Sequence, residues 1–161
     1  MNRERTAHPI PPVFDANSRV LILGSFPSVA SREAAFFYGH RQNRFWRVLG
    51  AVFGEEVPAD VAGKRAFLLS HGVALWDVIA ECEVVGSADA SIRGAVANDL
   101  SPIFAAAHIG RVFTNGQTAH RLYVRHLAPR FGEDLCLPST SPANASWSLE
   151  RLVEAWRVIK E

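Results

Sequence analysis

The chain has 161 residues, 48% of them hydrophobic and 20% charged, and its formal net charge is +1. This balance is typical of one globular domain, so we expect residues 1–161 to form a single domain with its own core. A charge so close to zero excludes a generally basic coat for nucleic acid, so any such binding requires a local patch. No apolar run reaches the ~18 residues of a membrane span, and no secretory signal region is visible.

The cysteines and histidines do not have the spacing of a metal site. Cys82 and Cys136 lie far apart and form no CxxC pair, which suits a reducing compartment. His120 and His126 are six residues apart on a predicted helix, off the one-turn spacing that shared metal ligation prefers. We therefore expect no metal and no other cofactor.

Short apolar strands alternate with helices along the chain. Residues 1–18 contain a proline-rich stretch and are predicted to form a loop or arm, and RVLILG (Arg19–Gly24) reads as a buried strand that ends at a glycine. The later patterns predict helices over 43–54, 59–72, 101–110, 117–129 and 149–160, and strands over 73–79, 111–116 and 134–138. This alternation indicates an α/β protein whose parallel sheet is covered on both faces.

In such a sheet, ligands bind beyond the carboxyl ends of the strands. The segments there are GSFPS, WDV, TNG and PSTSPANAS, which are polar, marked by glycine or proline, and rich in small hydroxyl residues. The stretch FFYGHRQNRFW (36–46) mixes aromatic rings, guanidinium groups and a carboxamide, which suits stacking on a flat base beside an anionic backbone. No Walker loop, GxGxxG fingerprint or GxSxG elbow is present.

The motif pair LILGSFPS…FYGHRQNRFW and LPSTSPANAS resembles the uracil-DNA glycosylase superfamily over nearly the whole chain. It is most similar to the branch that contains mismatch-specific uracil-DNA, thymine-DNA and hypoxanthine (deoxyinosine) DNA glycosylases. The resemblance implies a three-layer α/β/α sandwich with a small, mainly parallel four-stranded sheet. It also implies hydrolysis of the N-glycosidic bond of a base that has been flipped out of DNA.

Two motif positions depart from the mismatch-specific pattern. Phe26 replaces the asparagine of GINPG that is credited with handling the attacking water, and Leu137 replaces the usual histidine or asparagine that opens the last motif. Both changes match the hypoxanthine-DNA glycosylase branch, in which the asparagine of N-x-F-W is catalytic. The resemblance therefore implies that Asn43 positions water, whereas spacing alone favours a helix N-cap for Asn43. The two roles can coexist.

The resemblance also implies a base-binding pocket. Tyr38 falls where relatives stack a ring on the flipped base, Ser25 and Phe26 belong to the first motif, and Phe26 is expected to floor the pocket. At least one of the neighbouring rings Phe36 and Phe37 is expected in the core. Asp77 falls where relatives read the base, and its carboxylate can accept hypoxanthine N1–H or uracil N3–H equally. Two other roles stay open for Asp77, a general base and a turn cap at a strand end.

The last motif is implied to contact the DNA minor groove. Its serine and asparagine side chains suit phosphate contacts, and Pro142-Ala143 suits a wedge in the vacated base stack. A polar linker before the last helix is the alternative. The predicted DNA-binding residues are Ser28, Arg41, Asn115, Ser139, Ser141, Pro142, Ala143, Asn144 and Ser146.

We therefore predict a monofunctional DNA glycosylase, with hypoxanthine as the first expected substrate and uracil or xanthine as alternatives. A non-catalytic nucleotide or nucleic-acid binding module on the same fold is the alternative from another class. The predicted partner is DNA that contains a deaminated base. We expect a monomer in the cytoplasm with the chromosomal DNA and no association with a membrane.

Overall fold

The structure is a computed structural model that describes residues 4–34, 36–85 and 92–161. The strands are β1 (Glu4–Ala7), β2 (Val20–Gly24), β3 (Val73–Asp77), β4 (Ile79–Val84), β5 (Arg93–Ala97), β6 (Arg111–Asn115) and β7 (Asp134–Leu137). The helices are α1 (Val29–Ala34), α2 (Phe45–Phe53), α3 (Val61–Ser70), α4 (Ser101–Ala106), α5 (Gln117–His126), α6 (Ala128–Phe131), α7 (Leu149–Trp156) and the 3-10 helix η2 (Arg157–Lys160). Within the described ranges, no helix is long and apolar enough to cross a membrane.

The central sheet has four parallel strands in the order β3-β2-β6-β7. From β2 the chain first adds β3 on one side and later β6 on the other, so the direction of winding changes between β2 and β6. Open α/β sheets bind ligands beyond the carboxyl ends of the strands at such a change. The predicted α/β fold with a small parallel sheet is confirmed, and its topology points to the loops after β2 and β6.

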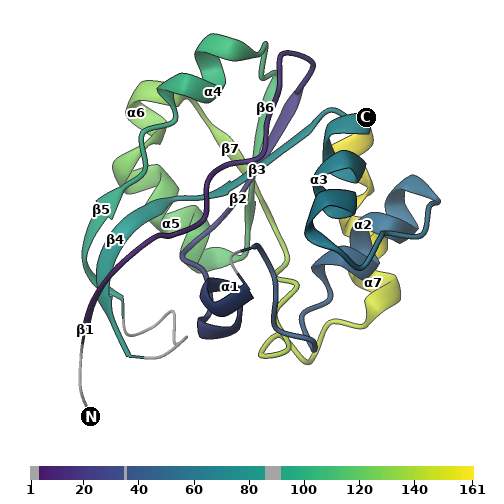
Figure 1. Ribbon diagram of the computed structural model, residues 1–161, viewed down its shortest axis with the longest axis horizontal. Helices are drawn as coiled ribbons and strands as arrows, with labels where there is room; N and C mark the ends of the chain where they lie inside the picture. Colours follow the sequence, from purple (N-terminus) through teal and green to yellow (C-terminus); the bar gives the residue numbers. More distant parts are fainter. Residues whose placement is uncertain (1–3, 35, 86–91) are drawn as a thin grey trace.

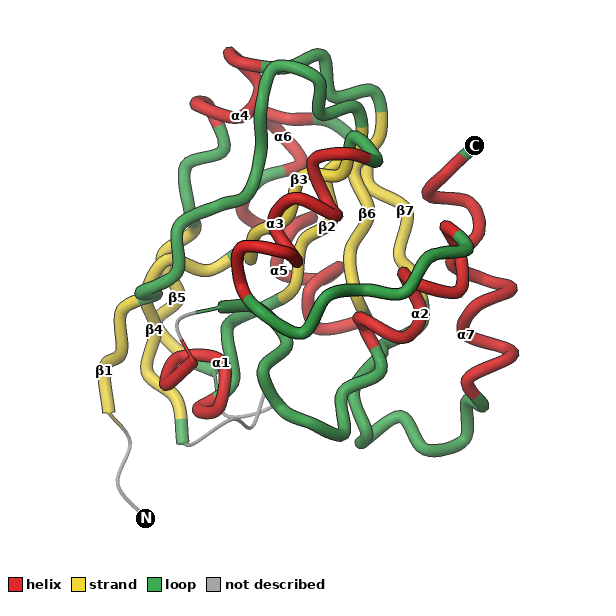
Figure 2. Tube along the Cα trace, turned by 45° about the vertical axis from the view of Figure 1, so that its right-hand side comes forward, coloured by secondary structure: helices red, strands yellow, loops and turns green. Residues whose placement is uncertain are grey.

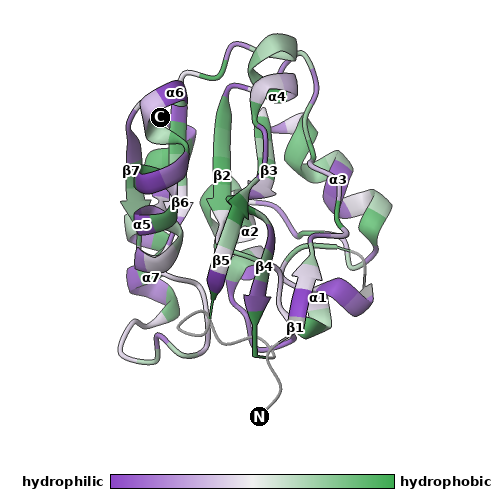
Figure 3. Ribbon diagram, turned by 90° about the vertical axis from the view of Figure 1, so that its left-hand side faces the viewer, coloured by the Kyte–Doolittle hydropathy of each residue, from purple (hydrophilic) through white to green (hydrophobic). Residues whose placement is uncertain are grey.

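Two hydrophobic cores lie on the two faces of this sheet. In β2, Val20 and Ile22 belong to one core while Leu21 and Leu23 belong to the other, as the alternation of side chains along a strand requires. Helices α2, α3 and α7 cover the first face, and α4, α5 and α6 lie on the opposite side (Figure 1). In Figure 3, β2 is coloured as hydrophobic along its length, as expected for a strand that is buried on both faces. The helices therefore form the two outer layers of a sandwich.

A second sheet was not predicted. Strands β1, β4 and β5 form an antiparallel sheet with β4 in the middle, beside α1 and away from α7 (Figure 2). The strand predicted over 73–79 is broken at Val78, where Asn98 Nδ2 donates to the backbone oxygens of Asp77 and Ile79. The loop or arm predicted over 1–18 contains a strand that was not predicted, since Glu4–Ala7 pairs with β4.

Helix boundaries account for the remaining differences. The helix predicted over 117–129 ends at His126, and Pro129 lies inside the separate short helix α6. The helix predicted over 101–110 ends at Ala106, and the helix predicted over 149–160 continues as η2 after Trp156.

Helix α1 follows the first motif and was not predicted. Its first turn is capped by Ser28, whose hydroxyl oxygen accepts a hydrogen bond from Ser31 N–H at 3.0 Å.

Gly24 lies where the ends of β2 and β3 come closest to the side chains of the site. It pairs with Asp77 in the parallel ladder, and a Cβ at Gly24 would lie 2.4 Å from Asp77 Oδ1 and 3.0 Å from Tyr38 Oη. These separations are below van der Waals contact, so only a residue without a Cβ leaves both side chains in place.

We predict that Gly24→Ala destabilises the protein by about 1–3 kcal/mol, because the added methyl group forces Asp77 and Tyr38 to move. Gly110→Ala is the matched control, since its Cβ would meet only Arg19 O at 3.8 Å, and we expect a change within about 0.5 kcal/mol. Urea unfolding of the two variants measures the difference. Equal midpoints would contradict the close approach at Gly24.

Candidate active site

A cavity of about 390 Å³ opens at the carboxyl edge of the parallel sheet. It is lined by the carboxyl ends of β3 and β6, by the loops after β2 and β7, by α1, and by the loop that precedes α2. Its lining residues are Gly24, Ser25, Phe26, Pro27, Ser28, Ser31, Phe37, Tyr38, His40, Asn43, Asp77, Asn115, Ser139, Thr140, Ser141, Pro142 and Ala143. The volume is in the range of small-molecule sites.

The carboxamide of Asn43 is held in one orientation. Its Oδ1 accepts the backbone N–H of Phe45 at 2.9 Å and the hydroxyl of Thr140 at 2.8 Å. A backbone N–H can only donate, so the oxygen must face Phe45 and the amide cannot be flipped. Two accepted hydrogen bonds occupy the lone pairs of Oδ1. The NH2 group of Asn43 is therefore its better group for binding a ligand.

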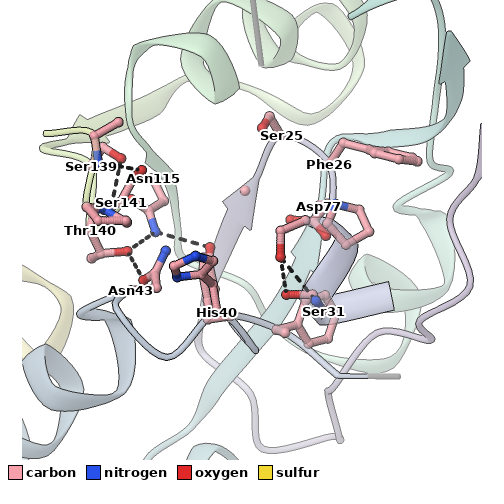
Figure 4. Close-up of a pocket in the computed structure, with 17 residues that line it drawn as sticks. Ser25, Phe26, Ser31, His40, Asn43, Asp77, Asn115, Ser139, Thr140 and Ser141 are labelled. Atoms are coloured by element: carbon pink, nitrogen blue, oxygen red, sulfur yellow. Dashed lines mark hydrogen bonds between the residues drawn. The ribbon is translucent and has the colours of Figure 1, made fainter. Parts of the chain in front are cut away.

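Asn115, at the end of β6, fixes the hydroxyl of Thr140. Thr140 N–H donates to Asn115 Oδ1 at 3.0 Å, and Asn115 Nδ2 donates to Thr140 Oγ1 at 3.0 Å and to Tyr38 Oη at 3.1 Å. Thr140 Oγ1 thus accepts from Asn115 and must donate to Asn43. Figure 4 shows this chain of hydrogen bonds on one side of the pocket.

The ring of Tyr38 is held from two directions. It stacks on Phe45 with centroids 4.0 Å apart and an interplanar angle of 16°, and its hydroxyl accepts from Asn115. Its backbone has φ = 54°, a left-handed conformation that is uncommon for a bulky residue and costs energy. Packing and hydrogen bonding hold this strained turn and fix the ring at the cavity wall.

Asp77 and Phe26 lie on the opposite side of the pocket from Asn43 (Figure 4). Asp77 is 4% exposed, at the carboxyl end of β3. Its Oδ2 lies 2.8 Å from His8 Nε2, and its Oδ1 lies against Gly24. The pocket thus places an amide donor and a carboxylate acceptor on facing walls.

The segment STSPANASW (139–147), here called the 139–147 loop, is fastened by Arg44. The guanidinium of Arg44 donates to the backbone oxygens of Ser141 and Asn144, each at 3.1 Å, and to that of Trp147. Arg44 N–H also donates to Thr140 O at 3.0 Å. These contacts commit the guanidinium of Arg44 to the loop rather than to a phosphate.

The structure brings most of the predicted site residues together. Asn43, all four predicted base-binding residues and six of the nine predicted DNA-binding residues line one cavity; the six are Ser28, Asn115, Ser139, Ser141, Pro142 and Ala143. Arg41 and Ser146 are exposed outside it, and Asn144 lines an adjoining hollow. Both amide hydrogens of Asn115 are engaged within the protein, so its geometry suits a connector between the pocket walls. Phe36 and Phe37 are 5% and 2% exposed, which confirms that rings of this stretch belong to the core.

Several contributors were missed by the sequence analysis. Thr140 lies in the quoted motif between two serines, and the only signal for its role was its place in that motif. His8 belongs to the arm, and its partner Asp77 is 69 residues away in sequence, so no local pattern indicates the contact. Gly24 was predicted to end a strand, but the sequence did not indicate that Asp77 lies too close for a Cβ at this position.

The site contains no residue suited to covalent catalysis by a thiol. Burial raises the pKa of the Cys136 thiol, which keeps it protonated and unreactive near neutral pH, and it lines the adjoining hollow. Within the described parts of the chain, no group of three His, Cys, Asp or Glu side chains is placed to hold a metal ion.

Comparisons with known proteins give sequence matches first. Residues 11–160 match the family profile described as the uracil DNA glycosylase superfamily. A hypoxanthine DNA glycosylase from Methanosarcina acetivorans is 34% identical over 151 residues, which cover 92% of this chain and 94% of the relative. A hypoxanthine DNA glycosylase from Methanosarcina barkeri is 36% identical over 92 residues, or 56% of this chain and 58% of the relative.

A solved structure is also similar. It is the solution NMR structure of a candidate uracil DNA glycosylase from Methanosarcina acetivorans, with a TM-score of 0.77 and 30% identity over 94% of this chain and 97% of the other. The fold and the site together define an enzyme of the DNA N-glycosylase class, a hydrolase that acts on N-glycosyl bonds. The chain belongs to the uracil DNA glycosylase superfamily.

We predict that Arg44→Lys loosens the 139–147 loop, because an ammonium group cannot reach three carbonyls in the planar fork of a guanidinium. The lost charge-assisted hydrogen bonds should destabilise the protein by about 2 kcal/mol. Urea unfolding and amide hydrogen exchange in residues 139–147 measure the effect. Arg47→Lys is the matched control, since Arg47 is exposed on α2. Identical exchange in the two variants would contradict the fastening role.

Proposed function

We propose that this glycosylase removes hypoxanthine from DNA by direct hydrolysis, after the damaged nucleotide has flipped into the cavity. The observation that carries the proposal is that the Asn43 carboxamide and the Asp77 carboxylate line opposite walls of one cavity of about 390 Å³. The relatives named hypoxanthine DNA glycosylase support this choice of base. Flipping costs a few kcal/mol and is cheapest for a mispaired base, which favours a deaminated target.

Departure of the base is the difficult step of the reaction. The deoxyribose gains oxocarbenium character while the base gains negative charge, so the site must stabilise both and admit one water. A carboxamide does not titrate and cannot act as a strong base. The proposed mechanism is therefore dissociative: the C–N bond breaks largely before water attacks, and the base leaves as an anion. As the new C–O bond forms, water gives up a proton, which neutralises the departed base directly or through solvent.

In this mechanism Asn43 positions water with its NH2 group. Oδ1 is held by Phe45 N–H and the Thr140 hydroxyl, so the amide hydrogens are the groups that best suit the water oxygen. A water bound by its oxygen keeps a second lone pair for attack on the sugar. The N-cap residue of α2 is Arg44 rather than Asn43, which the sequence had suggested as a cap. In this proposal the oxygen of Asn43 supports the start of α2 from one residue before the cap, and its nitrogen serves the reaction.

Asp77 reads the base. A carboxylate accepts hydrogen bonds, so it pairs with the N1–H of hypoxanthine. Uracil presents N3–H in the same way, so Asp77 does not separate the two bases, and the size and shape of the cavity must do so. Phe26 and Tyr38 provide the aromatic surfaces on which a base can stack.

The DNA duplex is proposed to lie against the 139–147 loop. Pro142 and Ala143 are exposed at the rim of the cavity, where they suit a wedge into the vacated stack. Arg41, two residues before Asn43, is exposed, and its guanidinium suits a phosphate contact. The protein is proposed to act as a monomer in the compartment that holds the chromosomal DNA.

No Schiff-base step is proposed. Lys64 lies over the ring of Trp46 at 5.1 Å, and Lys160 donates to Val52 O at 3.3 Å, so the two lysines of the chain are placed away from the cavity. With neither lysine at the sugar, the proposed product is an intact strand with an abasic site.

The substrate is tested with labelled duplexes that carry deoxyinosine, deoxyuridine or deoxyxanthosine at one position, opposite the same base. We predict strand breaks at deoxyinosine that appear only after alkali treatment, and a single-turnover rate faster than for the other two lesions. Faster excision of uracil or xanthine would reassign the substrate. Breaks without alkali would indicate lyase chemistry, and binding without breaks would support the non-catalytic module.

The role of the Asn43 NH2 is tested with two substitutions. Asn43→Asp keeps an oxygen for Phe45 N–H and Thr140 but loses the NH2 donor, and we predict a loss of about 10²–10³ in turnover, as for a missing transition-state donor. Asn43→Ala should lose at least as much. Single-turnover excision and thermal unfolding of both variants measure these effects. Turnover by Asn43→Asp at or above the wild-type rate would assign the function to an acceptor oxygen instead.

A further inference from the structure

The imidazole of His8 contacts Asp77 from outside the cavity. Its Nε2 lies 2.8 Å from Asp77 Oδ2, and the two side chains are only 2% and 6% exposed. The superfamily profile matches residues 11–160, so His8 precedes the matched region. The N-terminal arm therefore adds a buried polar group directly behind a side chain that we assign to base recognition.

The protonation of His8 follows from its second contact. Ile10 N–H donates to His8 Nδ1 at 3.1 Å. A backbone N–H can only donate, so Nδ1 must be an unprotonated acceptor, and the ring carries its proton on Nε2. The imidazole is thus neutral and donates to Asp77 Oδ2. The opposite tautomer would place two hydrogens between Ile10 N and Nδ1.

The arm holds this imidazole firmly. Two hydrogen bonds hold the backbone of the arm here: His8 N–H donates to Ala80 O at 2.6 Å, and Trp76 Nε1 donates to Ile10 O at 2.9 Å. The ring packs among Phe26, Phe37 and Trp76, with centroids between 6.0 and 6.2 Å away. Because these contacts fix the ring, its Nε2–H points in one direction, toward Asp77 Oδ2.

We propose that His8 is a positioning residue for base recognition, which holds Asp77 so that its other oxygen serves as an acceptor in the cavity. The inference rests on the proposed function. Asp77 Oδ2 is engaged by His8, while Oδ1 lies against Gly24, a residue that lines the cavity. The orientation of the carboxylate is therefore set by the arm as well as by β3.

A carboxylate fixed as an acceptor distinguishes hypoxanthine from adenine and uracil from cytosine. Adenine N1 and cytosine N3 are acceptors, and deamination turns both into N–H donors, as hypoxanthine N1–H and uracil N3–H. An acceptor oxygen in a buried site pairs with the deaminated edge and faces an uncompensated lone pair on the parent. The His8–Asp77 pair thus favours hypoxanthine over adenine and uracil over cytosine. Guanine and thymine also present an N–H to Asp77, so the walls of the cavity must exclude them.

Two substitutions separate positioning of Asp77 from simple fastening of the arm. His8→Asn places an acceptor oxygen near the Nδ1 position, so it can keep the Ile10 contact while losing the donor to Asp77. His8→Gln places an amide donor near the Nε2 position, so it can keep the contact with Asp77. If His8 only fastens the arm, the Asn variant should be the better substitute. If it positions Asp77, the Gln variant should be.

The experiment measures single-turnover excision from a deoxyinosine duplex, thermal unfolding, and the imidazole ¹⁵N shifts of His8 in the free wild-type protein. We expect His8→Asn to lose about 10- to 100-fold in rate, as for a lost hydrogen bond to a charged group, and His8→Gln to stay within about threefold of wild type. We expect the ¹⁵N shifts to report the neutral Nε2–H form.

Equal rates for the two variants, or a faster His8→Asn, would overturn the inference and leave the proposed function intact. A wild-type protein inactive on every duplex would overturn the proposed function and this inference with it. If both variants unfold, the ¹⁵N shifts decide, because an imidazolium or an Nδ1–H form contradicts the donation to Asp77.

Discussion

The site depends on the limited hydrogen-bonding capacity of one amide oxygen. Asn43 Oδ1 accepts from Phe45 N–H and from the Thr140 hydroxyl, and these contacts connect the start of α2 to the 139–147 loop. Because that oxygen is occupied, the NH2 group becomes the part of Asn43 that best suits a ligand. If Asn43 faced the other way, Phe45 N–H and Thr140 would each lose an acceptor, and the two loops would lose the contact that joins them. The orientation of the proposed catalytic group and the closure of the pocket thus have the same cause.

The sheet explains why these groups meet at all. The winding direction changes between β2 and β6, so the loops after these strands diverge and leave a hollow at the carboxyl edge. The first motif leaves β2 on one side of the hollow and Asn115 ends β6 on the other. Gly24 lets Asp77 and Tyr38 approach the end of β2. The fold therefore sets the position of the cavity, and the missing side chain of Gly24 in the first motif leaves space for Asp77 and Tyr38.

Much of this arrangement was predictable from local sequence. The apolar run before Gly24, the polar strand ends and the pairing of the two motifs were sufficient to predict the parallel sheet and to bring Asn43, Asp77 and the 139–147 loop to one edge. The periodicity of hydrophobic residues indicates which face of a helix or strand is buried, or that a strand is buried on both faces. Both features depend on neighbouring residues in the sequence. The carboxyl ends of parallel strands then converge by geometry alone.

The second sheet and His8 could not be predicted in the same way. Strand β1 pairs with β4 between positions 74 to 80 residues apart, with Glu4 opposite Val84 and Ala7 opposite Glu81. The segment ERTA has little hydrophobic alternation of its own. The break at Val78 depends on the side chain of Asn98, which is distant in sequence. Arg44 was similarly ambiguous, because a guanidinium that binds three carbonyls and one that binds a phosphate have the same sequence signature.

The polarity of the whole pocket traces back to backbone N–H groups. Phe45 N–H fixes the amide of Asn43, Thr140 N–H fixes the amide of Asn115, and Ile10 N–H fixes the tautomer of His8. Side-chain amides and imidazoles can reverse their donors and acceptors, whereas a backbone N–H cannot. Anchoring each reversible group to an irreversible one presents a donor on the Asn43 wall and an acceptor on the Asp77 wall before any base arrives. Such preorganisation avoids reorientation of the site during the reaction, which is where electrostatic catalysis gains most of its advantage.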